Sequence, residues 1–454
     1  MASSKTLNAR NLEALGAARL AQLLIEASVG QAATRRRLRL ELAGEAGPEH
    51  VTQEVAKRLA TLAKARTFIK WNRIRPLATD LAAQHRAIVE VVARADPRQA
   101  LDLLWRLMAL ADPIMARCND KSGQIGAVFR LAAADLAPLA IAADAAPEAL
   151  ARQVFGAVRE NRHAQFDGLI ARMAPALGAP GLMALRQALE AWGREYPGPP
   201  TAKALREIAD AQGDVDAYIA QFDDKARRVP GNAAEIADRL RKVGRLDEAW
   251  RAIEAVGEEA LGPGLAEWRQ ARVETLEALG RGDEAQAFRW ACFLSTLDAA
   301  QLRGHLKRLP DFDDIEAEDR AMAIALDHPD FNQALAFLID WPALDQASAL
   351  VLARVDEHDG DRHELLTRAA DALEARHPLA ATVARREVID FTLAAAWSSR
   401  YGHAARRLAE CADLAARIEH FAPHPSHEDY LRGLRTAHGR KTGLWRAVAK
   451  ASAL

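Results

Sequence analysis

The chain has 454 residues, of which 50% are hydrophobic and only 6% aromatic, and its formal net charge at pH 7 is −1. This balance excludes a global electrostatic attraction to nucleic acid or to an anionic membrane. A chain of this length is expected to form several domains or one extended repeat array. Its three cysteines lie far apart and form no CxxC pair, so a cytoplasmic protein without a disulfide framework is expected.

Helical patterning dominates the chain from its beginning. Much of the apolar content is alanine, the best helix former, and runs with the two-residue alternation of strands are missing. An amphipathic helix is predicted before Gly30, a strongly basic helix after it, and further helices follow Pro48 and Pro97. The apolar stretch 136–143 is much shorter than the ~20 residues that span a bilayer, and no signal peptide is recognisable. The sequence therefore predicts an all-α protein without membrane insertion.

Residues 31–75 form the most basic segment, with eleven Lys or Arg against four Glu and thus a local charge of +7. Near its end, cations alternate with Phe68 and Trp71, a pattern that can clamp phosphates and stack bases. A basic face can also be a solvated helix surface or pair with acidic neighbours such as the run of carboxylates in 311–319, within the chain or between chains. The candidate nucleic-acid-binding residues are Arg35, Arg36, Arg37, Arg39, Lys70, Arg73 and Arg75.

The clearest interruption of the helical pattern is Tyr196–Pro200, where three prolines and a glycine fall within five residues. Such a segment cannot continue a helix. We therefore predict two domains, an N-terminal helical domain over 1–196 and a helical-repeat domain over 197–454.

A repeated phrase lies beyond this boundary. Gly-Arg-Leu-Asp-Glu-Ala at 244–249 returns as Gly-Arg-Gly-Asp-Glu-Ala at 280–285, an offset of 36 residues. A period in the thirties, with a turn glycine before an alanine-bearing helix, is typical of tetratricopeptide-type helix pairs. Degenerate versions are expected near 330, 360 and 402. The predicted fold is a right-handed helical-repeat solenoid with an N-terminal helical bundle or array.

Nine tryptophans are available for packing or for binding. Six of them lie within helical stretches and are expected to fill gaps between helices. Trp71, Trp341 and Trp445 lie beside proline, glycine or basic interruptions, so we select these three as candidate partner-binding residues, because tryptophan is enriched at binding hot spots.

Two groups of histidines invite a metal-site hypothesis. His403, His420, His424, His427 and His438 lie near Cys411 and Glu428, and the run 358–364 places two histidines among carboxylates. Their spacing favours surface loops and capped turns instead. The chain also lacks the GxxxxGK[ST], HExxH, GxSxG and GxGxxG motifs. We expect no cofactor, no metal site and no enzymatic activity.

Several segments resemble known bacterial proteins. Residues 377–381, 389–393, 398–406 and 438–445 are similar to the helical tail of proteins that carry an N-terminal SWIM-type zinc finger, but the cysteine and histidine cluster of that finger is absent here. Together with the opening segment 7–16, they make the chain resemble an uncharacterised bacterial family known as a domain of unknown function. The resemblance implies a helical-repeat fold and no particular activity.

The sequence therefore favours a non-catalytic scaffold that binds a protein or peptide, because repeat arrays usually function as binding surfaces. The alternative is a nucleic-acid-associated protein that uses residues 31–75.

Overall fold

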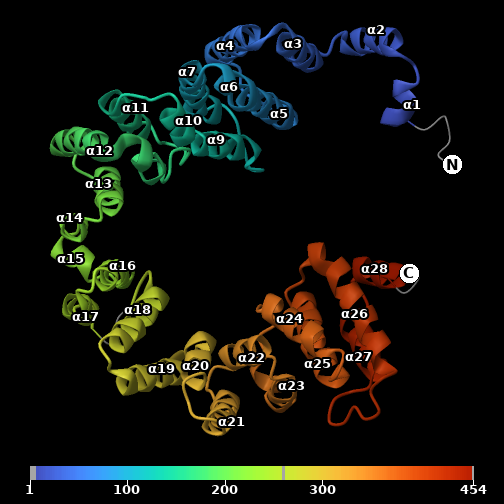
Figure 1. Ribbon diagram of the computed structural model, residues 1–454. Coiled ribbons are helices and arrows are strands. Elements are labelled where there is room, and N and C mark those ends of the chain that lie inside the picture. The colour runs from blue at the N-terminus through green and yellow to red at the C-terminus, as the bar shows by residue number, and fades with distance from the viewer. Residues whose placement is uncertain (1–6, 258–260, 452–454) are drawn as a thin grey trace. The chain divides into compact units, whose positions relative to one another are not determined.

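The computed structural model describes residues 7–257 and 261–451 and contains helices joined by turns and loops, with no strand assigned within those ranges (Figure 1). This confirms the predicted all-α class. The chain divides into two compact units, residues 1–227 and 228–454.

Unit 1 is built from fifteen helices and one π-helical turn within its described residues. They are α1 (Ala9–Glu13), α2 (Ala17–Ser28), α3 (Ala32–Ala46), α4 (Pro48–Lys64), α5 (Trp71–Ala87), η1 (Ile88–Val92), α6 (Ala93–Ala95), α7 (Pro97–Met108), α8 (Ala111–Met115), α9 (Gln124–Ala134), α10 (Leu136–Ala142), α11 (Pro147–Arg159), α12 (Leu169–Glu195), α13 (Pro199–Gln212), α14 (Val215–Ile219) and α15 (Asp224–Arg227).

One hydrophobic core runs through unit 1. Its buried residues extend from Ala43 to Ile208 and include Leu104, Ile114 and Phe129. Successive helices supply it, because α5 packs against α9, α7 against α10, and α12 against both α11 and α13.

The stretch Gln124–Ala142, which contains α9 and α10, is long and apolar enough to cross a membrane by length and composition. Several of its side chains, Phe129 and Leu136 among them, belong to the core of unit 1, where α9 and α10 pack against other helices.

Unit 2 continues with thirteen helices and two 3-10 turns within its described residues. They are α16 (Pro230–Lys242), α17 (Leu246–Glu254), α18 (Leu265–Ala278), α19 (Gly282–Thr296), α20 (Ala299–Leu306), α21 (Asp313–Leu326), α22 (Phe331–Asp340), α23 (Leu344–Ala353), η2 (Val355–Glu357), α24 (His363–Leu373), α25 (Pro378–Ala394), η3 (Ser398–Arg400), α26 (Tyr401–Ala415), α27 (His427–His438) and α28 (Thr442–Ala451).

The two copies of the repeated phrase adopt the same local structure. Gly244 and Gly280 have φ of 77° and 74°, the left-handed conformation that glycine adopts without strain after a helix. The next residues, Arg245 and Arg281, donate their backbone N–H to the carbonyls of Leu240 and Leu276, both at 2.9 Å. This pattern is a Schellman motif, and it turns one helix into the next at each repeat.

The side chains of the phrase are paired identically in both copies. Arg245 forms two hydrogen bonds with Glu248, each 2.7 Å long, and Arg281 forms two with Glu284, at 2.7 and 2.6 Å. The repeated sequence thus encodes a repeated structure, as predicted. Gly213, with φ of 67°, begins a similar turn that the sequence comparison did not reveal.

Neighbouring repeats are held together by aromatic packing. The Arg272 guanidinium lies 4.5 Å from the ring centroid of Phe288 and 5.5 Å from the rings of Trp250 and Trp268. Trp268 is only 2% exposed and donates its indole N–H to the Ile253 carbonyl at 3.1 Å. Arginine over aromatic rings is a favourable cation–π arrangement, so these tryptophans serve the core, as the sequence analysis expects.

The boundary between the units differs in position from the predicted one. The sequence predicts a domain boundary at 196/197, which stays a prediction, whereas the two compact units divide between Arg227 and Arg228. The proline-rich segment 197–200 instead joins α12 to α13, and these two helices pack against each other within unit 1. Prolines at the first positions of α13 end one helix and start the next without separating them.

Candidate partner-binding groove at the start of α5

A short extended segment precedes α5 and is fixed by backbone contacts with a distant loop. The Ile69 N–H donates to the Arg117 carbonyl at 2.8 Å, and the Arg117 guanidinium donates to the Thr67 carbonyl at 2.8 Å. Ile69 itself is 9% exposed and packs into the core of unit 1. Because side chains alternate along an extended backbone, anchoring Ile69 inward directs its neighbour Phe68 outward.

Two large aromatic side chains are therefore held in solvent. Phe68 is 63% exposed and Trp71, the first residue of α5, is 86% exposed. They line a surface groove of about 880 Å³. We call this the Trp71 groove; it is lined by Phe68, Ile69, Lys70, Trp71, Asn72, Ile74, Arg75, Pro76, Asn119, Lys121, Ser122 and Gln124.

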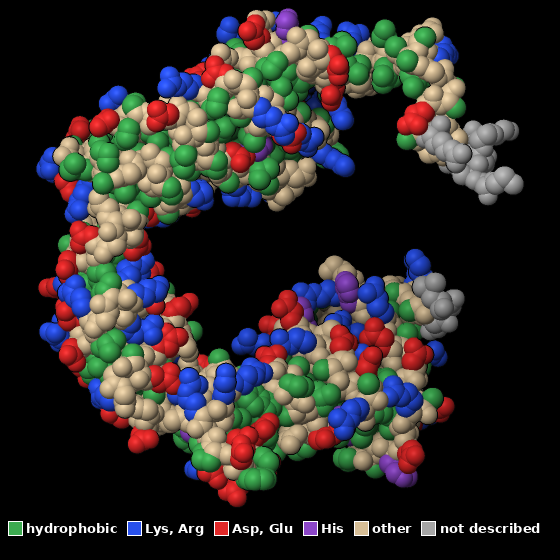
Figure 2. All heavy atoms as spheres, in the orientation of Figure 1, with side chains coloured by type: hydrophobic (Ala, Val, Ile, Leu, Met, Phe, Trp, Pro, Cys, Tyr) green, Lys and Arg blue, Asp and Glu red, His purple; other side chains and the backbone are tan. Residues whose placement is uncertain are grey.

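The charges around the Trp71 groove are positive and uncompensated. Lys70, Arg73, Arg75 and Lys121 are exposed, and none of them forms an ion pair with a described residue. Figure 2 shows Lys and Arg side chains gathered over α5. Basic side chains beside exposed aromatic rings favour a ligand with negative charge and an apolar anchor.

Sequence reasoning identified part of this site. It singled out Trp71, Lys70, Arg73 and Arg75, but it could not bring in Lys121, which follows α8 and reaches the groove through the contact between Ile69 and the 117–118 segment. That contact joins residues about fifty positions apart, and no local sequence pattern predicts it.

The arginines of the basic helix occupy a different place. Arg35, Arg36 and Arg39 line a second pocket of about 610 Å³ between α3 and α4. Arg36 lies 3.6 Å from Asp80, which also pairs closely with Arg58, so these two guanidinium groups share one carboxylate.

The other two basic-helix contacts are also internal. Arg37 pairs with Glu41 at 3.9 Å, and Arg35 donates to the Ser28 carbonyl at 3.1 Å. The structure thus places the seven predicted cations in two groups, and within the α3 group Arg36 and Arg37 have carboxylate partners.

Trp341 and Trp445 make internal contacts and are partly buried. The Trp341 indole N–H donates to Glu318 at 2.7 Å, and its ring stacks on Phe337 with centroids 5.6 Å apart. The Trp445 indole N–H donates to the His438 carbonyl at 3.0 Å. Of the three candidate tryptophans, Trp71 alone has an indole ring left largely in solvent.

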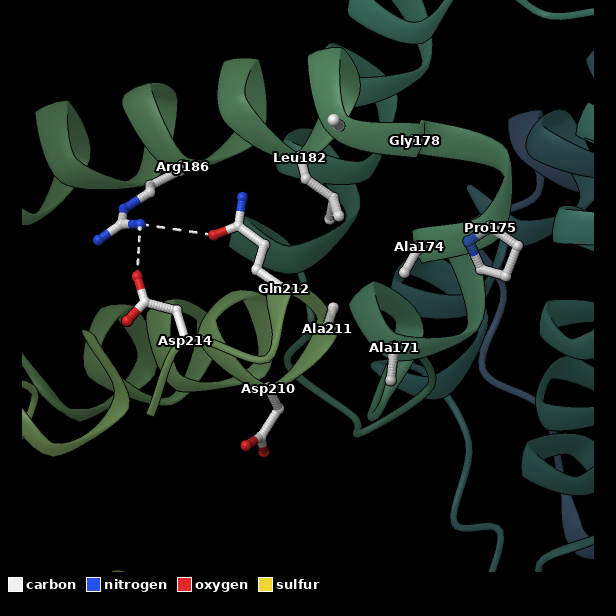
Figure 3. Close-up of a pocket in the computed structure, with 11 residues that line it drawn as sticks. Ala171, Ala174, Pro175, Gly178, Leu182, Arg186, Asp210, Ala211, Gln212 and Asp214 are labelled. Carbon is white, nitrogen blue, oxygen red and sulfur yellow. Dashed lines mark hydrogen bonds and ion pairs between the residues drawn. The ribbon is translucent and has the colours of Figure 1, made fainter. Parts of the chain in front are cut away.

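A further pocket of about 1,030 Å³ lies between α12 and α13 (Figure 3). Its wall contains Gly178, whose non-helical backbone interrupts α12 (φ 54°, ψ −173°). The Arg186 guanidinium contacts Gln212 at 3.4 Å and Asp214 at 3.7 Å, and Asp214 also caps α14. The rest of the wall is mainly apolar, with Asp210 as its other charged residue, and Arg186 is engaged by Gln212 and Asp214.

The C-terminal histidines show no arrangement of ligands for a metal ion. Among the residues that the structure describes, no group of three or more His, Cys, Asp or Glu side chains is placed to hold one. His427 begins α27, where Ser426 is the cap, and burial lowers the pKa of His358, His424 and His427. The nearby Arg386 guanidinium lowers the pKa of His424 and His427 further.

Comparisons with known structures return helical proteins. The chain is similar to one in the structure of Naa15/Naa10 bound to HypK-THB, with 14% identity, a TM-score of 0.32, and coverage of 91% of this chain and 67% of that one. It is also similar to a circular tandem repeat protein with novel repeat topology and enhanced subunit contact surfaces, with 17% identity, a TM-score of 0.18 and 95% coverage of each chain. A search of curated proteins found no match.

A protein-family comparison covers nearly the whole sequence. One family model, described as a family of unknown function (DUF6880), matches residues 2–204 and 200–447. This all-α helical-repeat chain belongs to the family of unknown function DUF6880.

Proposed function

We propose that the protein is a non-catalytic cytoplasmic scaffold whose Trp71 groove binds an acidic, apolar-anchored segment of a protein partner. The observation that carries this proposal is the 86% exposure of Trp71 beside the 63% exposed Phe68. Aromatic rings of this size stabilise a fold when buried, so two of them held in water by an anchored backbone favour a binding role.

The groove combines the features of an interface centre and its rim. Tryptophan, phenylalanine and arginine are enriched at protein interfaces, and a few buried aromatic anchors usually dominate the binding energy. Lys70, Arg73 and Lys121 form no ion pair with a described residue, so they can pair with acidic side chains of the partner. Rim charges of this kind accelerate association and select partners more than they add affinity.

Binding of single-stranded nucleic acid is the competing function, because bases also stack on aromatic rings in basic grooves. Ion pairing of Arg36 and Arg37 on α3 reduces the phosphate-binding capacity of the basic segment as a whole. Arg35 and Arg39 line the other pocket, whereas Lys70, Arg75 and Lys121 line the Trp71 groove, whose exposed surface is mostly apolar and therefore favours the protein partner.

The experiment is affinity capture of the tagged full-length protein from its native lysate, in nuclease-treated and untreated halves. The test variant is Phe68→Ala/Trp71→Ala. The matched control is Leu42→Ala/Ile141→Ala, which also removes two exposed large apolar side chains from unit 1, 69% and 57% exposed.

The proposal predicts that a partner protein co-purifies in stoichiometric amount even after nuclease treatment. The control variant should capture this partner as well, and the Phe68→Ala/Trp71→Ala variant should not. Loss of all enrichment after nuclease treatment would assign the groove to nucleic acid. Equal recovery by the test and control variants would refute a role for the groove.

A further inference from the structure

A second exposed aromatic surface lies at the start of α21. Phe312 is 79% exposed and Ile315 is 56% exposed. Phe312 has φ of 77°, a left-handed conformation that costs a residue with a side chain on the order of 1–3 kcal/mol. The chain therefore holds a large apolar side chain in water on a strained backbone, and such strain is often found at functional positions.

Carboxylates surround these two side chains. We call this surface the Phe312 patch; its exposed residues are Asp311, Phe312, Asp313, Ile315, Glu316 and Asp319. Figure 2 shows acidic side chains beside hydrophobic ones over α21. None of the four carboxylates forms an ion pair with a described residue, although the chain as a whole carries nearly equal numbers of acidic and basic residues.

The base of the Phe312 patch is rigidly supported. Glu318, on the same helix, accepts the hydrogen bond from the Trp341 indole at 2.7 Å, and Ala321 and Met322 of α21 are buried in the core of unit 2. Most of the patch thus lies on a helix that is packed against unit 2, and an ordered helix loses less entropy on docking than a loose loop.

The Phe312 patch and the Trp71 groove are complementary in charge, and both expose large apolar side chains. The patch combines Phe312 and Ile315 with carboxylates that form no ion pair with a described residue. The groove combines Phe68 and Trp71 with the exposed cations Lys70, Arg75 and Lys121. We propose that the Phe312 patch of one copy of this chain docks into the Trp71 groove of a second copy. This inference rests on the proposed function of the groove and names its partner.

The proposed contact joins two different surfaces, so it is heterologous. Each docked pair leaves one groove and one patch unoccupied, and association then continues from copy to copy or closes into a ring. Because the carboxylates and cations are exposed, added salt should weaken the association by screening them.

The test uses the full-length protein in sedimentation velocity over a concentration series. The groove variant is Phe68→Ala/Trp71→Ala and the patch variant is Phe312→Ala/Ile315→Ala. All four side chains are exposed, so folding should be unaffected; circular dichroism checks this. Leu42→Ala/Ile141→Ala is the control.

The wild type and the control are expected to associate with increasing concentration. Each variant alone should lose at least about tenfold in association constant, as truncation of interface anchors usually does. Mixing the groove and patch variants leaves one intact patch and one intact groove, so the mixture should form a dimer and stop there.

Two outcomes would overturn the inference. Wild-type protein that stays monomeric up to the highest soluble concentration would exclude the contact, and so would variants that associate as strongly as the control. Capture of a different protein that depends on Phe68 and Trp71, together with a monomeric wild type, would preserve the proposed function and reject the second copy as the partner.

Discussion

Gly264 provides the sharpest test of how the repeats of unit 2 pack. It caps α18 with φ of 81°, and a Cβ placed there would lie 2.2 Å from the Cα of Gly231 on α16. The Gly231 N–H donates to the Pro263 carbonyl at 3.2 Å, so two backbones touch where α16 meets α18. Replacing Gly264 with alanine must therefore separate these helices.

The expected cost has two parts. The left-handed backbone costs an alanine about 1–2 kcal/mol, and overpacking against backbone atoms adds about 1–3 kcal/mol. Gly280→Ala is the matched control, because Gly280 has φ of 74° but nothing within 4 Å of the added Cβ. We predict about 3 kcal/mol of destabilisation for Gly264→Ala and about 1 kcal/mol for Gly280→Ala.

Hydrogen exchange measured by mass spectrometry can follow the loss of stability in α16 and α18 separately from the rest of the chain. It does not require that a protein of two units unfolds in a two-state transition. Peptides from α16 and α18 should exchange about thirtyfold faster in Gly264→Ala than in Gly280→Ala, which corresponds to about 2 kcal/mol. Equal exchange rates in the two variants would refute the described contact between Gly231 and Gly264.

Four further predictions concern single side chains. Arg385 is buried and pairs with Asp371, Glu374 and Glu410. Arg385→Met should destabilise unit 2 by about 2–3 kcal/mol, as thermal denaturation can measure. This cost is smaller than that of breaking a fully buried ion pair, because the three carboxylates stay partly in solvent. Burial raises the pKa of Cys411 to about 12, so iodoacetamide at pH 8 should leave this thiol unmodified in native protein, and mass spectrometry would detect labelling that contradicts this. Burial would raise the pKa of Glu277, but the hydrogen bonds and charges of its arginine partners outweigh burial and hold that pKa below its ordinary value. The stability that Glu277 adds relative to Glu277→Gln should therefore be full at neutral pH and fall from about pH 5 downward. A difference in denaturation midpoint that does not change with pH would contradict this prediction. Phe312→Gly should relieve the left-handed strain and raise the stability of unit 2 by up to about 1 kcal/mol in denaturant titrations, while an unchanged or lower midpoint would contradict the strain.

The sequence predicted the fold well where local signals repeat. Gly244 and Gly280 mark turns because only glycine adopts their positive φ without strain, and each is followed by the same Arg–Glu pair. Gly213 is not followed by this phrase, so the sequence alone does not predict that it forms a similar turn.

The unit boundary and the binding residues depend on contacts between distant residues. Pro197 to Pro200 interrupt a helix, but the packing of α13 on α12 that keeps them within unit 1 has no local signature. The sequence predicts Trp341 as a partner anchor because Pro342 follows it, yet its hydrogen-bond partner Glu318 lies 23 residues earlier. Trp71 has no such partner among the described residues, and its exposure follows from the anchoring of Ile69 against Arg117.

The sequence of residues 311–319 shows an acidic segment, but it does not show that the apolar side chains within this segment are exposed. Phe312 and Ile315 are residue types that usually lie in a core. Acidic residues in the first turn of a helix usually stabilise the helix through its dipole. Only their exposure in the folded chain, 79% and 56%, distinguishes an apolar patch from a solvated helix end.

The central claim is that the Trp71 groove is the functional surface, and site-specific photocrosslinking tests it most directly. Asn72 lines the groove and is exposed, so a photoreactive amino acid at this position in the full-length protein, expressed in its native cells, reports what occupies it. We predict a crosslink to an acidic protein segment with an aromatic or aliphatic anchor, and specifically to residues 311–319 of a second copy. A crosslink to nucleic acid, or no crosslink above that of the same probe at the exposed Leu42, would contradict the account.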